Sequence, residues 1–413
     1  MSTKALQKQR TTVAIGTTIV LLMFGVCGCS LAGAAPPSPS GAQPVSAGND
    51  EGDHSVASSS ILPADYGIPK NWPWRGVTLT DFGIPGKDVT TSLGPPSSGP
   101  KDIDDAAQAG ANSVHLYLGI KKLAQRRHLN TAEAWTQAMQ WLDLMLAECK
   151  KDHMVAIVGF QSFPMPNGGY YKLTSAEFWN NPAAVNQIYT QVSRLAKRLH
   201  TYGNEFVAYN IISEPTIRIG GRTESPPDWE NIQKRIVETI RAQDPNRWIV
   251  VQPGPWGGAG GYKDFSPLPY SRLVYSVHIY APHAYTYQGI KKFPTGVRYP
   301  GTIHGRQVNK EALEKYLTPV FRFQQQNHAL IWVGEFSAVI WAPNSRQYLK
   351  DLVSTYDRYG WGWSYFAIGG WFGWDPNYNN KFAGDWKAAQ AQRVGLESER
   401  WETLRELFDM NGE

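Results

Sequence analysis

The stretch "EFVAYNIISEP", residues 205–215, is a largely apolar run that ends in a carboxylate. Unbroken apolar runs are typical of strands that are covered on both faces, as strands of parallel sheets are. Glu214 therefore stands where a buried strand leaves the core. A second run, "LIWVGEFS" at 330–337, repeats the pattern with Glu335. Two buried strands that end in carboxylates favour a parallel sheet whose strand ends form a site.

Short apolar runs of this kind recur along the chain and alternate with amphipathic segments. Eight of them predict strands, at 75–80, 112–118, 154–160, 205–212, 248–253, 273–280, 330–335 and 360–368. Helical periodicity predicts helices near 102–110, 131–151, 183–200, 228–243, 310–328 and 346–358, with a last segment near 398–410.

Eight strand and helix units in ~350 residues predict an α/β fold, a (β/α)8 TIM barrel with long loops. A doubly wound sheet is the alternative, but no glycine-rich phosphate loop follows the first strand. The glycine-rich "GGAGG" at 257–261 has no GxGxxG spacing before a helix and no Walker lysine, so we expect a flexible loop there.

The first 29 residues have the pattern of a targeting segment. Basic side chains at Lys4, Lys8 and Arg10 precede the apolar core "VAIGTTIVLLMFGV". The following "VCGC" resembles the bacterial lipobox, which implies a lipoprotein signal over residues 1–29 and lipid on Cys29. This predicts an anchor at the bacterial cell envelope, in the outer membrane if the organism is Gram-negative. A secretory signal cleaved near "AGAA" is the alternative.

A tether and a single folded domain are expected to follow. Residues 30–62 are rich in Ala, Pro, Ser and Gly and have too little apolar area to offset the entropy of ordering. All sixteen tryptophans lie after them, so 63–413 is the predicted domain. Cys149, within the predicted helix at 131–151, is then the one cysteine of that domain, which predicts an inert core thiol and no intrachain disulfide.

The charge balance does not indicate a nucleic-acid or anionic-membrane partner. The formal net charge is +5. Three positive charges belong to the targeting segment, which leaves about +2 for the rest, too little to indicate nucleic acid or an anionic membrane surface as a partner.

The strand-end carboxylates indicate a reaction class. Strand ends of one barrel face a common mouth, where catalytic residues gather, although Glu214 and Glu335 are 121 positions apart. Paired carboxylates suit glycosidic bond cleavage, with one protonated to supply the leaving oxygen and the other ionised to attack the anomeric carbon. A separation of roughly 5–5.5 Å predicts retention through a covalent glycosyl-enzyme.

Four motifs resemble glycoside hydrolase family 5, the cellulase-like family of retaining (β/α)8 glycosidases. "NIISEP" resembles its strand-four signature, "VHIYAPHAYTYQG" its His-x-Tyr segment after strand six, "IWVGEFS" its nucleophile strand and "GWSYF" its strand-eight motif. The order and spacing agree over about residues 72–410.

The resemblance implies roles for individual residues. Glu214 would be the acid/base and Glu335 the nucleophile, with His278 and Tyr280 lining the site and the Tyr280 hydroxyl bonded to Glu335. Tryptophans that could stack on sugar rings, or equally belong to the core, are Trp256, Trp363, Trp371 and Trp374.

Four positions depart from the family pattern. Ser213 stands where an Asn that binds the sugar 2-hydroxyl is usual, and His115 stands where strand two usually has Arg. Phe160 and Gln161 stand near the usual strand-three histidine, and Phe366 aligns with the usual tryptophan platform of strand eight. These changes predict a remodelled sugar subsite.

The expected activity is that of a retaining endo-acting glycoside hydrolase on a β-linked polysaccharide, either a β-glucan or an exopolysaccharide. A transglycosylase with the same site and a non-catalytic carbohydrate-binding barrel are the alternatives. The mechanism implies no cofactor. His278 and His283 share their stretch with no carboxylate, so no metal site is expected, and the protein is expected to be a monomer.

Overall fold

The computed structural model describes residues 67–80, 98–163, 173–203, 205–290, 293–379 and 393–409. The predicted signal segment with Cys29 and the predicted tether lie outside these residues. No helix in the described part of the chain has the length and apolar character needed to span a bilayer.

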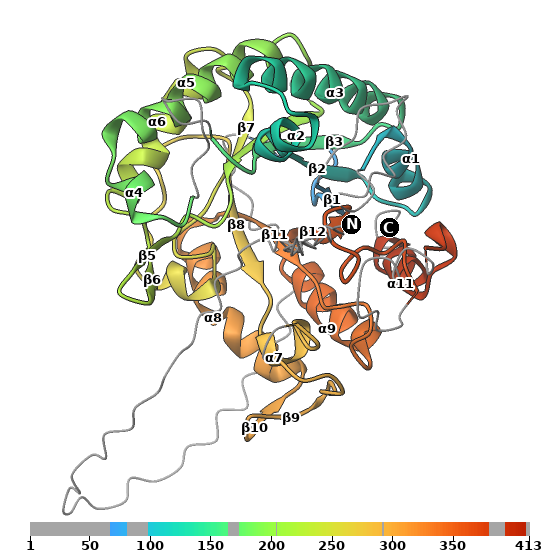
Figure 1. Ribbon diagram of the computed structural model, residues 1–413. Helices are drawn as coiled ribbons and strands as arrows, with labels where there is room; N and C mark the ends of the chain where they lie inside the picture. The colour runs from blue at the N-terminus through green and yellow to red at the C-terminus, as the bar shows by residue number, and fades with distance from the viewer. Residues whose placement is uncertain are drawn as a thin grey trace, which may run out of the picture. The chain divides into compact units, whose positions relative to one another are not determined.

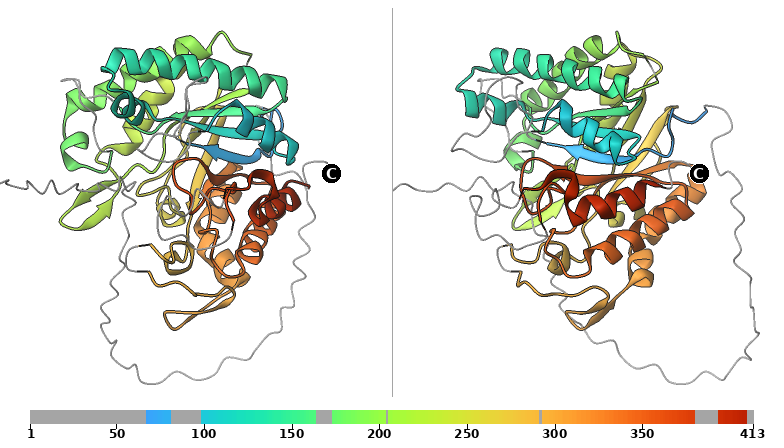
Figure 2. Two further views of the ribbon diagram at one scale, coloured as in Figure 1. Left: turned by 45° about the vertical axis from the view of Figure 1, so that its right-hand side comes forward. Right: turned by 90° about the vertical axis from the view of Figure 1, so that its right-hand side faces the viewer.

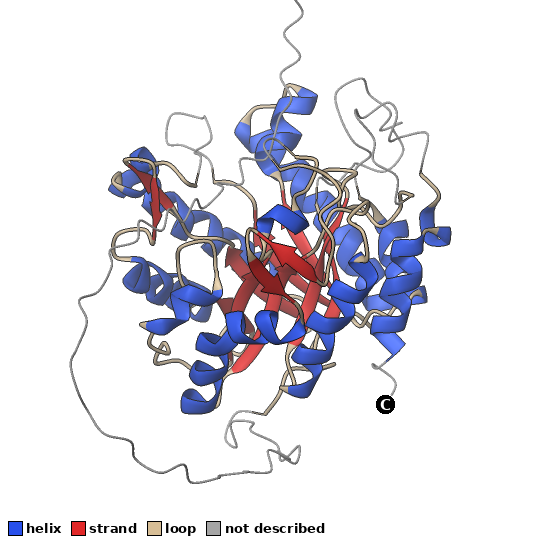
Figure 3. Ribbon diagram, turned by 90° about the horizontal axis from the view of Figure 1, so that it is seen from below, coloured by secondary structure: helices blue, strands red, loops and turns tan. Residues whose placement is uncertain are grey.

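All eight predicted strands are present, and they close into one barrel in which every neighbouring pair is parallel (Figures 1 and 3). Around the barrel the order is β1, β12, β11, β8, β7, β4, β3 and β2. Their bounds are β1 (Arg75–Leu79), β2 (Ser113–Leu118), β3 (Val155–Phe160), β4 (Val207–Ile212), β7 (Trp248–Val251), β8 (Leu273–Ile279), β11 (Leu330–Phe336) and β12 (Gly362–Ile368). The TIM-barrel prediction is confirmed, and the doubly wound alternative is wrong.

The predicted helices surround this barrel. Their bounds are α1 (Pro100–Gln108), α3 (Thr131–Lys151), α5 (Pro182–Leu199), α6 (Trp229–Arg241), α8 (Lys310–Asn327), α9 (Ser345–Arg358) and α11 (Glu399–Phe408). The sequence marks the start of α3, the longest helix. The Asn130 side chain accepts from the backbone N–H groups of Ala132 and Glu133, and the Glu133 carboxylate accepts from the backbone N–H of Asn130. Figure 2 shows α11 alongside α9.

The loops also contain smaller elements that the periodicity did not predict. They are α2 (Ile120–Arg127), α4 (Ala176–Trp179), α7 (His283–Thr286), the hairpin β5 (Ile217–Ile219) with β6 (Arg222–Glu224), the hairpin β9 (Gly301–Ile303) with β10 (Arg306–Val308), and the 3-10 turns η1 (Ala259–Lys263) and η2 (Gly395–Glu397). The flexible loop expected at 257–261 is a wrong prediction. Gly257 accepts a hydrogen bond from His278 N at 2.9 Å, and η1 begins two residues later.

The barrel interior is layered. Near the amino ends of the strands lies an apolar cluster made of Trp74, Val155, Ile157, Ala208, Val250, Val274, Leu330 and Trp332. Thr78, His115, Asn210 and Ser364 lie inside the barrel further along the strands and are joined by hydrogen bonds. The apolar cluster closes the barrel floor, so the polar groups that follow it are held on a packed base. Outside the barrel, Cys149 is a free thiol that is fully buried in α3, as predicted.

Candidate active site

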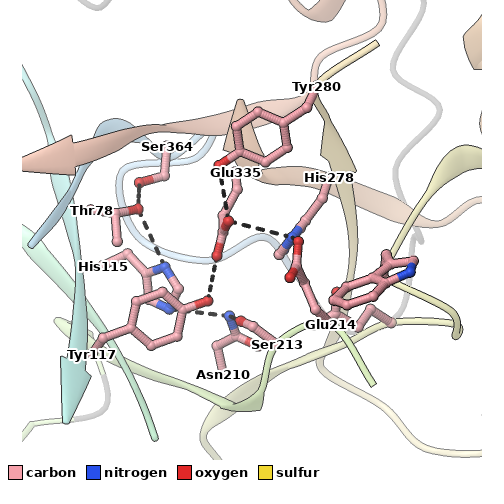
Figure 4. A network of polar contacts seen from close by, with 12 residues as sticks. Thr78, His115, Tyr117, Asn210, Ser213, Glu214, His278, Tyr280, Glu335 and Ser364 are labelled. Atoms are coloured by element: carbon pink, nitrogen blue, oxygen red, sulfur yellow. Dashed lines mark hydrogen bonds and ion pairs between the residues drawn. The ribbon is translucent and has the colours of Figure 1, made fainter. Parts of the chain in front are cut away.

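The two glutamates approach each other at the carboxyl ends of β4 and β11. An oxygen of Glu214, an oxygen of Glu335 and a ring nitrogen of His278 all lie within 4.8 Å of one another. Figure 4 shows the three side chains converging from β4, β11 and β8. The proximity that strand-end reasoning predicted from positions 121 apart in sequence is therefore present.

Glu214 lies just beyond its strand in an unusual backbone conformation. β4 ends at Ile212, two residues before the carboxylate, and Glu214 has a φ of 55°, in the left-handed region. Such residues cost about 1–3 kcal/mol and cluster at functional sites. Gln252 donates from Nε2 to the carbonyl of Ile212 at 2.8 Å, which holds the end of β4 in place. The strand predicted at 205–212 therefore ends at the observed residue, and Glu214 lies two residues beyond it.

Glu335 points into the barrel because β11 carries an extra residue. Val333 pairs with Val277, whereas Glu335 pairs with His278, so two steps on β11 match one step on β8. Trp332 already points inward, and strict alternation would turn Glu335 toward the helices. A bulge of this kind re-aims a side chain. Phe336 resumes the outward direction and packs against Tyr356 and Trp363.

The two carboxylates have different hydrogen-bond partners. Tyr117 donates to Oε1 of Glu335 at 2.7 Å, and Tyr280 donates to Oε2 at 3.0 Å (Figure 4). Glu214 has His278 as its partner, with Nδ1 3.1 Å from Oε1. Two donors favour the ionised form of Glu335 relative to Glu214.

Burial raises the pKa values of both carboxyl groups. Desolvation raises the pKa of Glu214 to about 8. Desolvation also raises the pKa of Glu335 to about 7, where the nearby His278 and the two tyrosine hydroxyls oppose the rise and the charge of Glu214 adds to it. The side chain of Glu214 is 17% exposed and that of Glu335 is 4% exposed, so Glu214 faces the opening while Glu335 lies deeper. Near neutral pH the pair favours a protonated Glu214 and an ionised Glu335.

His278 is a neutral bridge between the carboxylates. Its side chain is 2% exposed, and Nδ1 lies 3.7 Å from Oε2 of Glu335 in addition to its contact with Glu214. Burial lowers the pKa of His278 below its usual range, although the charge of Glu335 opposes this. The ring therefore forms a hydrogen bond with Glu214 instead of a full ion pair.

Aromatic rings form one wall of the site. Tyr280 lies 6.0 Å from the Trp374 ring and 6.5 Å from Phe366, and Phe366 lies 5.7 Å from Trp374. Trp371 is half-buried and packs on Trp374 at 4.9 Å. Tyr287, which the sequence reasoning did not select, contacts both Tyr280 and Trp374.

Trp256 follows β7 and is half-buried, with its backbone N–H bonded to Thr216, two residues after Glu214. Arg218 lies over its ring at 5.5 Å. Ser213 is also half-exposed beside Glu214, and its hydroxyl accepts from Asn210 Nδ2 at 3.1 Å.

Two of the predicted sugar-binding residues lie elsewhere. His115 is fully buried inside the barrel, where Asn210 Nδ2 lies 3.1 Å from its Nε2, and burial lowers its pKa well below the usual range. It supports the site from below and touches no solvent. Trp363 is fully buried on the helical side of β12, stacked on Phe408 of α11 at 4.9 Å. Neither side chain is placed to contact a sugar in this structure.

Sequence reasoning also missed Tyr117. The next inward position after His115 on a regular strand is two residues on, which is Tyr117, and this period-2 rule was the available signal.

Two groups of side chains in the described residues have metal-ligating geometry. The first is Glu214, His278 and Glu335, so His278 does meet carboxylates, although they come from other strands. Both Glu335 oxygens already accept tyrosine hydroxyls, which favours the paired-carboxylate arrangement. The second is Asp104, Glu148 and Asp152 on the helical side, where Lys151 lies as a counter-ion to all three.

Comparison with known proteins agrees with this arrangement. A family model described as "Cellulase (glycosyl hydrolase family 5)" matches residues 77–371. Endoglucanase C of Acetivibrio thermocellus is 22% identical over 295 residues, which cover 64% of this chain and 83% of the endoglucanase.

Solved structures show the same fold at low identity. A crystal structure of a glycoside hydrolase gives a TM-score of 0.60 at 20% identity, covering 82% of this chain and 99% of its own. Endoglucanase Cel5A from Thermotoga maritima gives 0.58 at 15% identity, covering 81% of this chain and 96% of its own. The family model, which matches more than half of the chain, carries the assignment of family.

Proposed function

The chain belongs to glycosyl hydrolase family 5 and is a glycoside hydrolase, and from this premise we propose that it cleaves β-linkages within a polysaccharide with retention of configuration. Glu335 acts as the nucleophile and Glu214 as the acid/base. The observation that carries the proposal is the pair of carboxylates within 4.8 Å of each other in unlike environments. Retaining enzymes place their carboxyl groups roughly 5–5.5 Å apart, whereas inverting enzymes leave room for a water between them.

The first step forms a glycosyl-enzyme. An oxygen of the ionised Glu335 attacks the anomeric carbon, the glycosidic C–O bond breaks, and the proton of Glu214 moves to the departing oxygen. The Tyr280 hydroxyl donates to the attacking carboxylate and holds it in place. A protonated Glu214 suits this role because desolvation raises its pKa to about 8.

The second step reverses the roles. Glu214, now ionised, takes a proton from a water that attacks the anomeric carbon, and the bond to Glu335 breaks. The product keeps the configuration of the substrate, and both carboxyl groups return to their initial states. Sugar rings stack on exposed aromatic faces, for which the half-buried Trp371 and Trp256 are the candidates beside the glutamates.

We propose a β-glucan as the substrate class, because Endoglucanase C of Acetivibrio thermocellus, to which the chain is similar, is an endoglucanase. A soluble β-glucan, a mannan and a bacterial exopolysaccharide, scored by product size, test this choice. Longer products than the starting chains would identify a transglycosylase, and binding without cleavage would identify a carbohydrate-binding barrel.

Substitution of the glutamates tests the mechanism. Glu214→Ala should lower turnover of an unactivated glycan by about 10²–10⁴-fold, and Glu335→Ala by at least as much. Azide distinguishes the roles on an aryl β-glycoside with a good leaving group. Glu214→Ala should yield the β-glycosyl azide, formed through the covalent intermediate, whereas Glu335→Ala should yield the α-azide by direct attack. Circular dichroism should show both variants folded. Normal turnover in either variant, or an inverted first product from the unaltered enzyme, would contradict the proposal.

A further inference from the structure

β2 contributes a tyrosine that the activity proposed above does not by itself explain. Tyr117 is 4% exposed, and its hydroxyl lies 2.7 Å from Oε1 of Glu335. This is shorter than the 3.0 Å contact that Tyr280 makes with Oε2. Each oxygen of Glu335 thus accepts one hydroxyl, and the two donors come from opposite parts of the barrel, β2 and the end of β8.

The Tyr117 ring rests on a support that reaches across the barrel. The rings of Tyr117 and His115 lie 4.2 Å apart. Asn210 of β4 contacts Nε2 of His115, and Thr78 of β1 contacts Nδ1 at 3.5 Å. Thr78 is bonded in turn to Ser364 of β12 at 2.9 Å (Figure 4). Since His115 is buried and neutral, this support holds the ring by packing and hydrogen bonds and adds no charge beside Glu335.

The hydroxyl of Tyr117 remains a donor throughout the working pH range. Burial, with the charge of Glu335 next, raises the pKa of Tyr117 well above its usual range. The hydroxyl also interacts with Ser213, whose own hydroxyl accepts from Asn210. Tyr117 therefore lies close to both the nucleophile and Ser213, the residue before the acid/base.

We propose that Tyr117 is a positioning residue that orients Glu335 for attack and stabilises its ionised form, a role that rests on Glu335 being the nucleophile. In a site with little water, a hydroxyl bonded to a carboxylate favours the charge that the reaction requires. Without that hydroxyl, Glu335 loses one of its two donors and a smaller fraction of the enzyme is ready to attack at low pH. The effect belongs to the chemical step, so it should appear in kcat more than in KM.

The test is Tyr117→Phe, which removes the hydroxyl and keeps the ring on His115. We expect the acidic limb of the kcat/KM profile to move up by about one pH unit, equivalent to a tenfold loss on its acidic side. At pH values above the acidic limb the loss of kcat/KM should become smaller, and KM should change less than twofold. Tyr275→Phe is the matched control, because that hydroxyl is buried on the helical side of β8 and accepts from Leu268 N at 3.1 Å. Its pH profile should match the unaltered enzyme.

A second readout does not depend on turnover. Titration of the Glu335 carboxyl by carbon-13 NMR, in a Glu214→Gln background, should show a higher pKa when Tyr117 is Phe. An unchanged carboxyl pKa, or an equal loss of activity at every pH, would overturn the positioning role and leave Tyr117 as packing. If Glu335→Ala kept normal turnover, the proposed function would fail first. If Glu335→Ala is inactive and the Tyr117→Phe profile is unshifted, only the present inference fails.

Discussion

At the scale of single residues, the site is defined by two carboxyl groups whose surroundings differ. Glu335 lies deep and accepts two hydroxyls, whereas Glu214 is nearer the opening and contacts His278. Burial raises both pKa values, and the hydrogen bonds keep that of Glu335 the lower of the two. The separation of acid and nucleophile therefore follows from neighbours and depth, because the two side chains are chemically identical.

The pH dependence of activity follows from these pKa values. Glu335 must be ionised, which requires a pH above about 7, and Glu214 must be protonated, which requires a pH below about 8. We expect a bell-shaped kcat/KM profile with its maximum between these values, and the two limbs report the pair as a coupled unit. Initial rates on a soluble β-glucan from pH 4 to pH 10 would measure it. A maximum near pH 4 to 5 would contradict the assignment.

Stability should depend on the same groups with a defined sign. A carboxyl group whose pKa is raised by folding stabilises the protein below its unfolded pKa, and this contribution is lost as pH rises through the folded value. For Glu214 this contribution is lost as the pH rises from about 4.5, the usual pKa of the group, to about 8, its pKa in the folded protein. We expect Glu214→Gln to raise the free energy of unfolding at pH 8 by about 2 kcal/mol, less than the full shift would give because the group is partly hydrated.

Urea unfolding at pH 4.5 and pH 8 measures this difference. The gain should nearly vanish at pH 4.5, where folded Glu214 is protonated. Glu224→Gln, on the exposed hairpin strand β6, is the control and should show no gain that depends on pH. Equal gains at both pH values would show that packing, and not charge, separates the variants.

At the scale of elements, both carboxylate strands carry one extra residue in their pairing. On β4 the pairing runs from Tyr209 to Ile212 while β3 advances only from Val158 to Phe160, and on β11 the shift precedes Glu335. Gly159 permits the first irregularity, since a Cβ there would lie 1.9 Å from the carbonyl oxygen of Asn210. These irregularities turn polar side chains toward the mouth of a barrel that regular strands would fill with apolar layers.

Gly334 is the residue on which the second irregularity depends. A Cβ at this position would lie 2.5 Å from Ser276 Oγ and 3.2 Å from His278 Nε2. We expect Gly334→Ala to displace Glu335 or His278 and to lower kcat/KM by about 10–100-fold, at a stability cost of about 1–3 kcal/mol. Kinetics with thermal unfolding would measure both. Gly260→Ala, where the new Cβ meets nothing within 4 Å, is the control. Unaltered activity in Gly334→Ala would show that the bulge does not set the aim of Glu335.

At the scale of the whole molecule, the barrel gathers into one site residues that are far apart in the chain. Tyr117, Glu214, His278 and Glu335 come from four strands and meet within hydrogen-bonding reach of their neighbours. The eight-stranded closure fixes this meeting, because each strand end can move only with the strands beside it. The aromatic wall is added by the segments after β8 and β12.

The predicted anchor belongs to this scale as well. We expect Cys29→Ala to move the protein from the membrane fraction to the soluble fraction of the producing bacterium, since a lipid on Cys29 would be the attachment. Immunoblots of the two fractions measure this, with Cys149→Ala as the control, because Cys149 is a buried thiol of the folded domain. Unchanged membrane association in Cys29→Ala would favour the alternative of an ordinary secretory signal.

Much of the fold could be predicted because its evidence is local. Apolar runs marked all eight strands, and helical periodicity placed α3 at its observed bounds. The same local evidence failed for Trp363, which is predicted together with Phe366 to line the site, although only Phe366 lies there. Residues three apart on a regular strand face opposite sides. Because Phe366 faces Tyr280, Trp363 faces away from the site and packs against α11.

The sequence by itself determined the order of elements, the barrel and the two strands that deliver carboxylates, because periodicity and strand ends are properties of neighbouring residues. The family resemblance already implied that His278 and Tyr280 lie beside them, but only the tertiary structure decided the remaining contacts of those carboxylates. The bulge in β11 aims Glu335, Tyr117 reaches it in place of His115, and burial sets the pKa values. Register, burial and hydrogen bonds between strands depend on residues far apart in the chain, so no local pattern contains them.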